Sequence, residues 1–324
     1  MSRVALISGI TGQTGSYLSE LLLEQGYEVH GIVRRTTSND KYHRINHILH
    51  RLHIHDGDLL DIGSIEKAIG DSKPDEIYNL AAQSFVGTSW KQPYLTMQTT
   101  GGGTLNMLEA MRKLAPAARF YQASTSELFG DVRETPQVET TPFYPRSPYG
   151  AAKAYAHYIT VNYRESYGLF ASCGIAYNHE SPRRGAEFVT RKITRAVAQI
   201  AHKKASEVCL GNLDSKRDWM SAKCAARAMY MILQHNKPDD YIIGTGETHS
   251  VRKFMELAFA RVGLDWREYV KYDAAMVRPA EVDVLLANPA KINKEIGWKP
   301  ELSFDGLVDW MVDSDMKLCD SGKL

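Results

Sequence analysis

The sequence predicts an α/β fold, a doubly wound parallel sheet followed by a smaller C-terminal α/β domain. Short apolar runs alternate with helical segments of period 3.6 through the first half of the 324-residue chain. Such alternation is typical of a parallel sheet with helices on both faces. After about residue 177 the alternation loosens, and residues 178–185 are rich in polar and turn types. We therefore expect a sheet domain over 1–177, to which 217–245 returns, and a substrate-binding domain over 178–324.

Strands are expected where short apolar or β-prone runs meet turn residues. In chain order these are 4–7, 28–33, 52–55, 76–80 and 119–122. The first helix carries Leu18, Leu21 and Leu22 on one face and should end at Gly26. Later, Ser147 followed by Pro148 matches the cap and first position of a helix that runs to about Tyr167.

Composition is that of an ordinary globular enzyme, with 44% apolar and 24% charged residues. A net charge of +1 indicates neither nucleic acid nor an anionic membrane as partner, so an anionic ligand needs a local basic cluster. The chain enters its first strand without a signal-peptide pattern, and no apolar run is long enough for a membrane span. The four cysteines lack metal-ligand spacing, so we expect free thiols, no metal and a cytoplasmic location.

A glycine-rich turn after the first strand indicates a dinucleotide site. The run from 9 to 15, GITGQTG, has glycines at positions 9, 12 and 15 and opens a helix. Glycines let the backbone turn tightly and approach a pyrophosphate, which the helix N-terminus attracts. The pattern is weak alone, but this strand–turn–helix context makes it specific for a Rossmann-type fold.

The end of the second strand suggests which dinucleotide is bound. NAD-binding folds place an acidic residue there, whereas this chain has Arg34 and Arg35. Arginines at this point pair with a 2′-phosphate, which favours NADP, although a solvated or subunit-interface pair is the alternative. Asp58 follows the third strand, where it either meets the adenine amine or is an ordinary loop carboxylate.

Four side chains form the candidate catalytic group. Tyr149 and Lys153 are four residues apart and share a helix face. A nearby ammonium favours the phenolate, so Tyr149 is expected to act as a base near neutral pH. Thr125 and Glu127 precede them, and Glu127 adds a second acid–base group. Two such groups indicate a reaction with more than one proton-transfer step.

These motifs resemble those of the extended short-chain dehydrogenase/reductases. The glycine turn, the run NLAA at 79–82 and the Tyr149-xxx-Lys153 pair carry the resemblance. Over nearly its whole length the chain is similar to the GDP-mannose 4,6-dehydratase family. The shared segments are 78–86 (YNLAAQSFV), 120–128 (FYQASTSEL), 141–149 (TPFYPRSPY), 159–168 (ITVNYRESYG), 178–185 (NHESPRRG), 188–195 (FVTRKITR), 217–219 (RDW), 278–282 (RPAEV) and 297–300 (GWKP).

The resemblance implies NADP-dependent dehydration of GDP-D-mannose to GDP-4-keto-6-deoxy-D-mannose. It makes Tyr149 the base at the sugar 4-hydroxyl and Thr125 a hydrogen-bonding partner of the same sugar oxygen. It makes Lys153 the ligand of the nicotinamide ribose and Glu127 the acid–base group at C5 and C6. It implies cofactor contacts from Gly9, Thr11, Gly12, Gln13, Gly15, Arg34, Arg35, Asp58, Leu59, Leu80, Ala81, Ala82, Ser84, Tyr149 and Lys153. Substrate contacts are implied for Ser84, Asn178, Val189, Lys192, Arg217, Arg278 and Glu281.

The chain departs from the family pattern at Thr14, Gly101, Met220 and Cys224. Tyr177 replaces a more apolar residue, and we expect it to pack in the core rather than reach the sugar. Because these changes spare the acid–base residues, the alternatives are a related GDP-sugar such as a GDP-heptose, or another nucleotide-sugar epimerase or reductase. A catalytically inactive nucleotide-sensing protein is more remote. The family commonly forms homodimers or homotetramers, and the segment 35–44 is a candidate contact loop.

Overall fold

The computed structural model describes residues 2–37, 40–274, 280, 282 and 284–324. Its centre is a seven-stranded sheet in the order β11-β6-β5-β4-β1-β2-β3, and every neighbouring pair is parallel. The strands are β1 (Val4–Ser8), β2 (Glu28–Val33), β3 (Leu52–Asp56), β4 (Glu76–Asn79), β5 (Arg119–Thr125), β6 (Ala171–Ala176) and β11 (Asp240–Ile243). The predicted fold class and all five predicted strands are confirmed.

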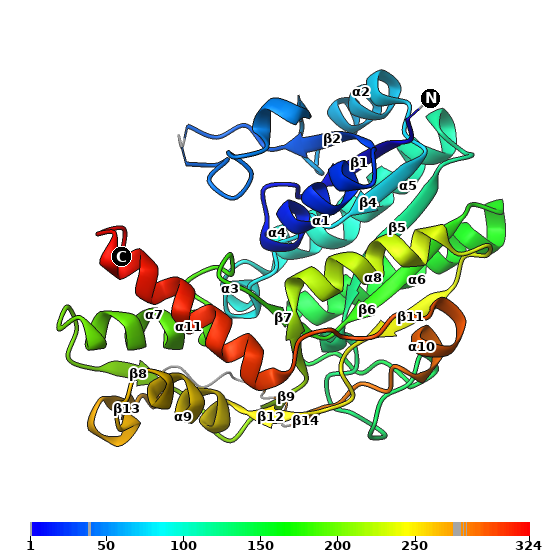
Figure 1. Cartoon of the computed structure of the whole chain (residues 1–324). Coiled ribbons are helices and arrows are strands. Elements are labelled where there is room, and N and C mark those ends of the chain that lie inside the picture. The colour runs from blue at the N-terminus through cyan, green and yellow to red at the C-terminus, as the bar shows by residue number, and fades with distance from the viewer. Residues whose placement is uncertain (1, 38–39, 275–279, 281, 283) are drawn as a thin grey trace.

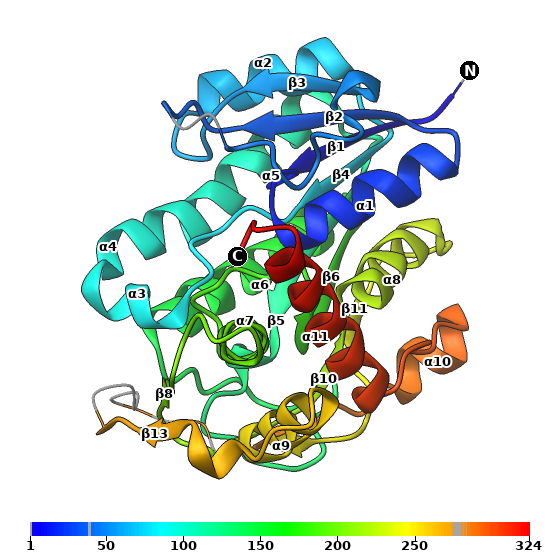
Figure 2. The same ribbon diagram turned by 60° about the vertical axis from the view of Figure 1, so that its left-hand side comes forward.

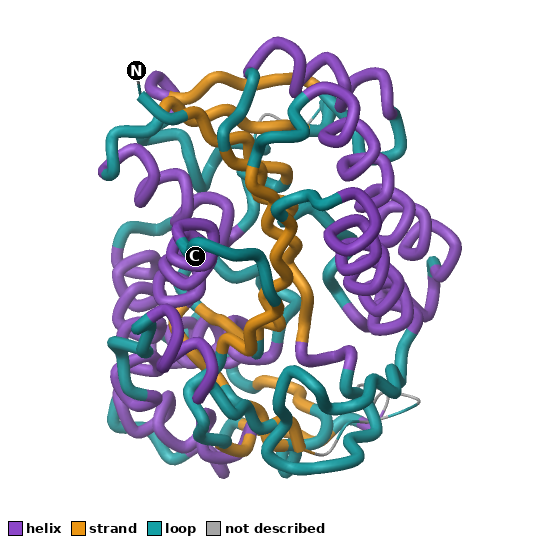
Figure 3. Tube along the Cα trace, turned by 90° about the vertical axis from the view of Figure 1, so that its right-hand side faces the viewer, coloured by secondary structure: helices purple, strands orange, loops and turns teal. Residues whose placement is uncertain are grey.

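Helices cover both faces of this sheet, as the edge-on view in Figure 3 shows. On one face lie α1 (Gln13–Glu24) and α8 (Ala222–Gln234), and on the other α2 (Ile62–Ser72), α5 (Gly103–Leu114) and α6 (Pro148–Tyr167). Successive side chains of β1 point to opposite faces of the sheet and pack in different hydrophobic cores. Ala5 and Ile7 pack with α1, whereas Leu6 packs with α2. A parallel strand buried on both faces therefore reads as a continuous apolar run.

The remaining elements lie mainly beyond the carboxyl end of the sheet (Figure 1). Helices α7 (Val189–Ala201), α9 (Val251–Arg261) and α11 (Phe304–Asp320) enclose a second core that includes Trp219 and Phe254. Short strands join them: β7 (Asn178–Glu180), β8 (Val208–Leu210), β9 (Lys216–Arg217), β10 (Trp219–Ser221), β12 (His249–Ser250), β13 (Val270–Tyr272) and β14 (Val284–Leu285). The other helical segments are α3 (Val86–Lys91), α4 (Pro93–Thr96), α10 (Ala290–Ile296), η1 (Leu49–Arg51), η2 (Met97–Gly102), η3 (Ser126–Leu128) and η4 (Trp266–Glu268).

The chain crosses between the two cores more than once. After β10, helix α8 packs against α1, and β11 then pairs with β6 at the edge of the large sheet. A hydrogen bond also ties the C-terminal segment to α8, because the indole of Trp298 donates to the Cys224 carbonyl over 3.0 Å. Among the described residues, none of the helices has both the length and the apolar character needed to cross a membrane.

A π-helix interrupts the helical run from α4 to α5. Residues Met97–Gly102 form this segment, η2, which packs on α6. Gly101 permits the approach, since a Cβ there would lie 3.0 Å from a ring carbon of Tyr155. The departure from the family pattern at Gly101 therefore falls at a close helix–helix contact rather than in a loop.

Candidate active site

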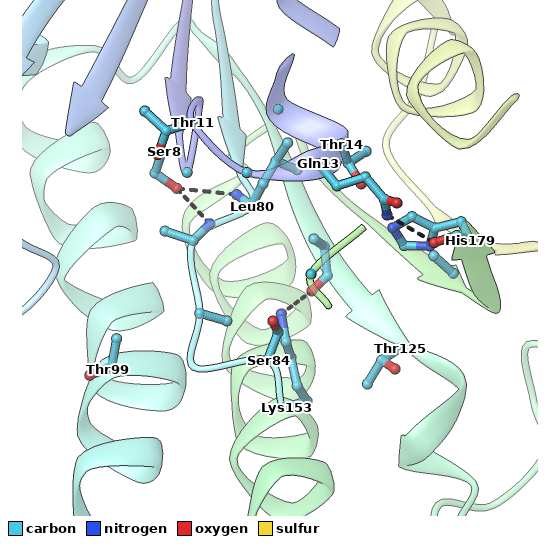
Figure 4. Close-up of a pocket in the computed structure, with 18 of the residues that line it drawn as sticks. Ser8, Thr11, Gln13, Thr14, Leu80, Ser84, Thr99, Thr125, Lys153 and His179 are labelled. Carbon is cyan, nitrogen blue, oxygen red and sulfur yellow. Dashed lines mark hydrogen bonds between the residues drawn. The ribbon is translucent and has the colours of Figure 1, made fainter. Parts of the chain in front are cut away.

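A cavity of about 540 Å³ opens at the carboxyl ends of the sheet strands and is drawn in Figure 4. Ligands of open α/β sheets bind at this edge. Residues from both halves of the chain form its wall. The predicted residues that line it are Gly9, Thr11, Gly12, Gln13, Gly15, Arg34, Asp58, Leu59, Leu80, Ala81, Ala82, Ser84, Thr125, Glu127, Tyr149, Lys153 and Asn178.

The glycine turn is shaped to hold a diphosphate. Gly9 has φ +77°, and a Cβ there would lie 2.9 Å from the Ala81 nitrogen. Gly12 caps α1 in an extended conformation without a side chain, which leaves the first N–H groups of the helix available to a ligand. Ser8 fixes the neighbouring strand end, since its hydroxyl accepts from the N–H groups of Leu80 and Ala81 over 3.1 and 3.2 Å. These features fit a nicotinamide dinucleotide.

Three adjoining elements carry the candidate catalytic group. Thr125 ends β5, Glu127 lies in η3, and Tyr149 and Lys153 lie in the first turns of α6. As predicted, Ser147 caps α6, and its hydroxyl accepts from the Gly150 N–H over 3.0 Å. β5 extends three residues beyond its predicted end at Gln122, since these last residues also pair with β6. They are small or polar, so no apolar pattern in the sequence marked them as part of the strand.

Gly150 sets the spacing between α6 and η3. A Cβ at Gly150 would lie 2.8 Å from the Glu127 carbonyl oxygen, closer than real Cβ atoms approach. The absence of a side chain therefore lets the start of α6 rest against η3. This contact brings the Tyr149 end of the helix beside Glu127.

The ionisation of Tyr149 differs from the sequence expectation. Burial raises its pKa to about 12, although a hydrogen bond with Thr125 opposes the shift. Burial also lowers the pKa of Lys153 to about 8. The ammonium of Lys153 donates to the Ala123 carbonyl over 2.7 Å and lies 6.0 Å from the Tyr149 ring centre. In the ligand-free protein, desolvation of the phenol therefore outweighs the hydrogen bond that favours its ionised form, and the neutral phenol predominates at neutral pH.

Lys153→Met is expected to stabilise the protein by about 1–3 kcal/mol at pH 7, because a pKa unit corresponds to about 1.4 kcal/mol. The folded pKa of about 8 lies below the ordinary 10.5. The cost of burying the ammonium is thus fully present below pH 8 and disappears between there and pH 10.5. Urea denaturation at pH 7 and pH 10 tests this. Exposed Lys237→Met is the control, and an equal effect of Lys153→Met at both pH values contradicts the argument.

Several wall residues were not singled out from the sequence. They are Ser8, Thr99, Arg44, His179, Arg184, Glu187 and Phe188. His179 is the most informative, since burial lowers its pKa to about 4 and its backbone carbonyl accepts from Gln13 over 2.9 Å. The segment 178–185 that holds His179 and Arg184 was recognised as family-like. Its individual side chains gave no signal of their own.

Other predicted contacts lie away from this wall. The chain that the structure describes leaves Arg35, Val189, Lys192 and Arg217 outside the cavity lining. Arg278 and Glu281 fall outside the described residues.

The departures from the family pattern have structural settings. Thr14 lies in the first turn of α1 at the cavity wall. Met220 is buried in the core beside α1 and α8. The thiol of Cys224 accepts from the Glu301 N–H over 3.4 Å. Tyr177 is buried and its hydroxyl donates to Gln137 over 2.8 Å, although the residue also contributes to the cavity lining.

The parallel sheet, glycine turn and Tyr–Lys helix define an extended short-chain dehydrogenase/reductase. A solved UDP-glucose 4-epimerase from Thermus thermophilus, in complex with NAD, superposes with a TM-score of 0.84 at 27% identity, covering 96% of this chain and 98% of that one. The family model for GDP-mannose 4,6 dehydratase matches residues 6–311. GDP-mannose 4,6 dehydratase 1 of Arabidopsis thaliana is 48% identical over 99% of this chain and 92% of its own length. The human (Homo sapiens) GDP-mannose 4,6 dehydratase is 49% identical over 97% of this chain and 92% of its own length. The chain belongs to the GDP-mannose 4,6-dehydratase family, a family of hydro-lyases.

Proposed function

We propose that the protein converts GDP-D-mannose to GDP-4-keto-6-deoxy-D-mannose with NADP as its cofactor. The observation that carries the proposal is Glu127 on the same cavity wall as Thr125, Tyr149 and Lys153. A 4-epimerase or 4-keto reductase needs the Tyr–Lys pair but no proton transfer at C5, so Glu127 would be idle in either. A dehydratase uses both acid–base groups.

Each side chain has a defined task in this proposal. The nicotinamide ring supplies a hydride acceptor for C4 and a hydride donor for C6. Tyr149 takes the proton of the 4-hydroxyl, and Thr125 hydrogen-bonds the same oxygen. The 4-keto group acidifies the C5 hydrogen, which Glu127 removes. Glu127 then protonates the departing 6-hydroxyl, so that water leaves and the carboxylate is restored. When C6 receives the hydride, C5 takes up a proton, and Tyr149 gives up the proton that it took from the 4-hydroxyl, so that the overall change is the loss of one water. Lys153 binds the nicotinamide ribose.

The preference for NADP rests on Arg34, which is exposed at the cavity wall directly after β2. A guanidinium there pairs with a 2′-phosphate, whereas NAD offers a ribose hydroxyl. The related Thermus epimerase was solved with NAD. Arg35 is exposed beside Arg34 but does not line the cavity, so we assign it a weaker role.

We further propose a homodimer or homotetramer in the cytoplasm. Helices α3, α4 and α6 lie against one another and expose large apolar side chains, which marks an interaction surface. These are Trp90, Tyr94, Leu95, Tyr155 and Tyr158. The four cysteines are free thiols, as expected for a reducing compartment.

Hydride tracing tests the reaction. Purified protein is incubated with NADP and GDP-mannose carrying deuterium at C4. We expect the 4-keto-6-deoxy product to carry that deuterium at C6, because one hydride moves within one sugar. The same assay with NAD should be slower at equal concentration. Release of the label to solvent, or absence of a keto sugar, contradicts the proposed reaction.

A further inference from the structure

Four side chains with metal-binding atoms gather at the rim of the large sheet, outside the cavity lining. Glu28 and His30 belong to β2, and His53 and His55 to β3, the outermost strand. The register pairs His30 with His53 directly. Because residues two apart on a strand point to the same side, the two E-x-H and H-x-H pairs share one face. Figure 2 shows these two strands at the end of the sheet, beneath α2.

The ligand atoms are spaced as a small metal ion requires. Oε1 of Glu28 lies 3.0 Å from Nε2 of His30 and 3.5 Å from Nε2 of His53, and each of the three residues places one ligand atom within 4.8 Å of those of the other two. Bonds of about 2.0–2.1 Å around a tetrahedral ion separate its ligands by roughly 3.3 Å. The distances from Oε1 of Glu28 to the two imidazole nitrogens lie on either side of this value. Small side-chain rotations would therefore close the site around an ion.

The buried histidine of the group is already oriented. Nδ1 of His30 lies 2.8 Å from Nε2 of His55, and the His30 ring stacks on both neighbours, 4.6 Å from His53 and 5.2 Å from His55 between ring centres. One of two tautomers has His30 donating its Nδ1–H to His55. Nε2 of His30 then presents a lone pair on the side of Glu28. Ligating histidines almost always donate their second N–H in this way.

The metal-free protein keeps the same contacts with the other tautomer. Nε2–H of His30 then donates to Glu28, and His55 donates to Nδ1 of His30. The change between the two forms moves protons and leaves the rings in place. The hydrogen bonds that join Glu28, His30 and His55 do not involve His53. Its side chain is 59% exposed, yet its Nε2 faces the Glu28 carboxylate.

We propose that Glu28, His30 and His53 bind one Zn²⁺ or a similar first-row transition-metal ion, with water as the fourth ligand. His55 is a positioning residue that orients His30. Two imidazoles and one carboxylate are typical zinc ligands, whereas Mg²⁺ and Ca²⁺ favour sets of six or more oxygens. The side chains of Glu28 and His53 are 43% and 59% exposed, so an ion can enter from solvent.

The expected role is structural rather than catalytic. A bound ion joins the edge strand β3 to β2 through side chains, in addition to their backbone pairing. Arg34, directly after β2, and Asp58, shortly after β3, both line the cavity. An ion that links the two strands therefore also stabilises the positions of these residues in the cofactor half of the cavity. Because an ion that binds only the folded state stabilises it, zinc should raise the melting temperature.

Calorimetric titration of untagged, chelator-treated protein with Zn²⁺ tests the proposal. We expect one site in the wild type and in His50→Ala, which removes an exposed histidine three residues from His53. His53→Ala should weaken binding at least tenfold, and His55→Phe by about 10–100-fold, the usual cost of losing an orienting partner. Since His53 is largely exposed, His53→Ala should fold normally and retain full turnover of GDP-mannose.

A second probe identifies the ligands independently of activity. Co²⁺ in place of zinc should give the visible absorption of a tetrahedral nitrogen–oxygen site in the wild type and His50→Ala, and lose it in His53→Ala. Three results overturn the proposal. These are no zinc binding by the wild type, equal binding by His53→Ala, and thiolate-to-cobalt absorption, which would assign the ion to cysteine.

Discussion

Glu127→Gln should reduce formation of the 4-keto-6-deoxy sugar by about 10²–10⁴-fold, the usual contribution of a positioned acid–base group. Glutamine keeps the size of the side chain and its backbone position in η3, where the Glu127 N–H donates to Thr125 over 3.3 Å. It cannot accept the C5 proton. Oxidation at C4 does not need that proton transfer, because Tyr149 and Thr125 remain. The reaction should therefore stop between its first and second steps.

Rapid mixing of Glu127→Gln with NADP and GDP-mannose gives the decisive readout. We expect reduced-nicotinamide absorbance to appear and persist, with no exchange of the C5 hydrogen in deuterated water. Glu165→Gln is the matched control, because this exposed carboxylate lies at the far end of α6. Wild-type turnover by Glu127→Gln would remove Glu127 from the mechanism and return the epimerase and reductase alternatives.

Patterns local in sequence predicted the sheet well. The strands alternate with amphipathic helices, and the Ser147–Pro148 signal fixed the start of α6. Apolar periodicity and capping depend on neighbouring residues, so one sequence contains them. The predicted glycine-turn residues all line one cavity for the same reason. That turn is a continuous stretch of backbone.

Properties that depend on distant parts of the chain could not be predicted in this way. The pKa of Tyr149 is set by burial, which no spacing between Tyr149 and Lys153 encodes. His179 reaches the cavity because β7 pairs with β10, a contact between segments about forty residues apart. The histidine cluster needs the register of β2 against β3, which brings His30 opposite His53. Each case requires the packed structure.

Tyr149→Phe should also lower turnover by about 10²–10⁴-fold, but at the first step rather than the second. Phenylalanine preserves the buried ring and the packing of α6, and removes the hydroxyl that takes the 4-hydroxyl proton. No reduced nicotinamide should appear on mixing, in contrast to Glu127→Gln. Tyr167→Phe is the control, because this tyrosine is 54% exposed at the end of the same helix. Transient reduction of the cofactor in Tyr149→Phe would assign the first proton to another base.

The pH profile separates Tyr149 from a purely structural residue. kcat/KM reports the free enzyme, in which the pKa of Tyr149 is about 12 and that of Lys153 about 8. The reactive form holds a phenolate and an ammonium together. Below pH 8 the fraction of this form rises with pH, because the phenolate fraction grows while Lys153 stays charged. Above pH 8 the gain in phenolate is offset by loss of the ammonium, so wild-type kcat/KM should rise to about pH 8 and then level off. In Tyr149→Phe the rising limb should disappear, whereas a residue that only supports packing would lower the rate equally at every pH.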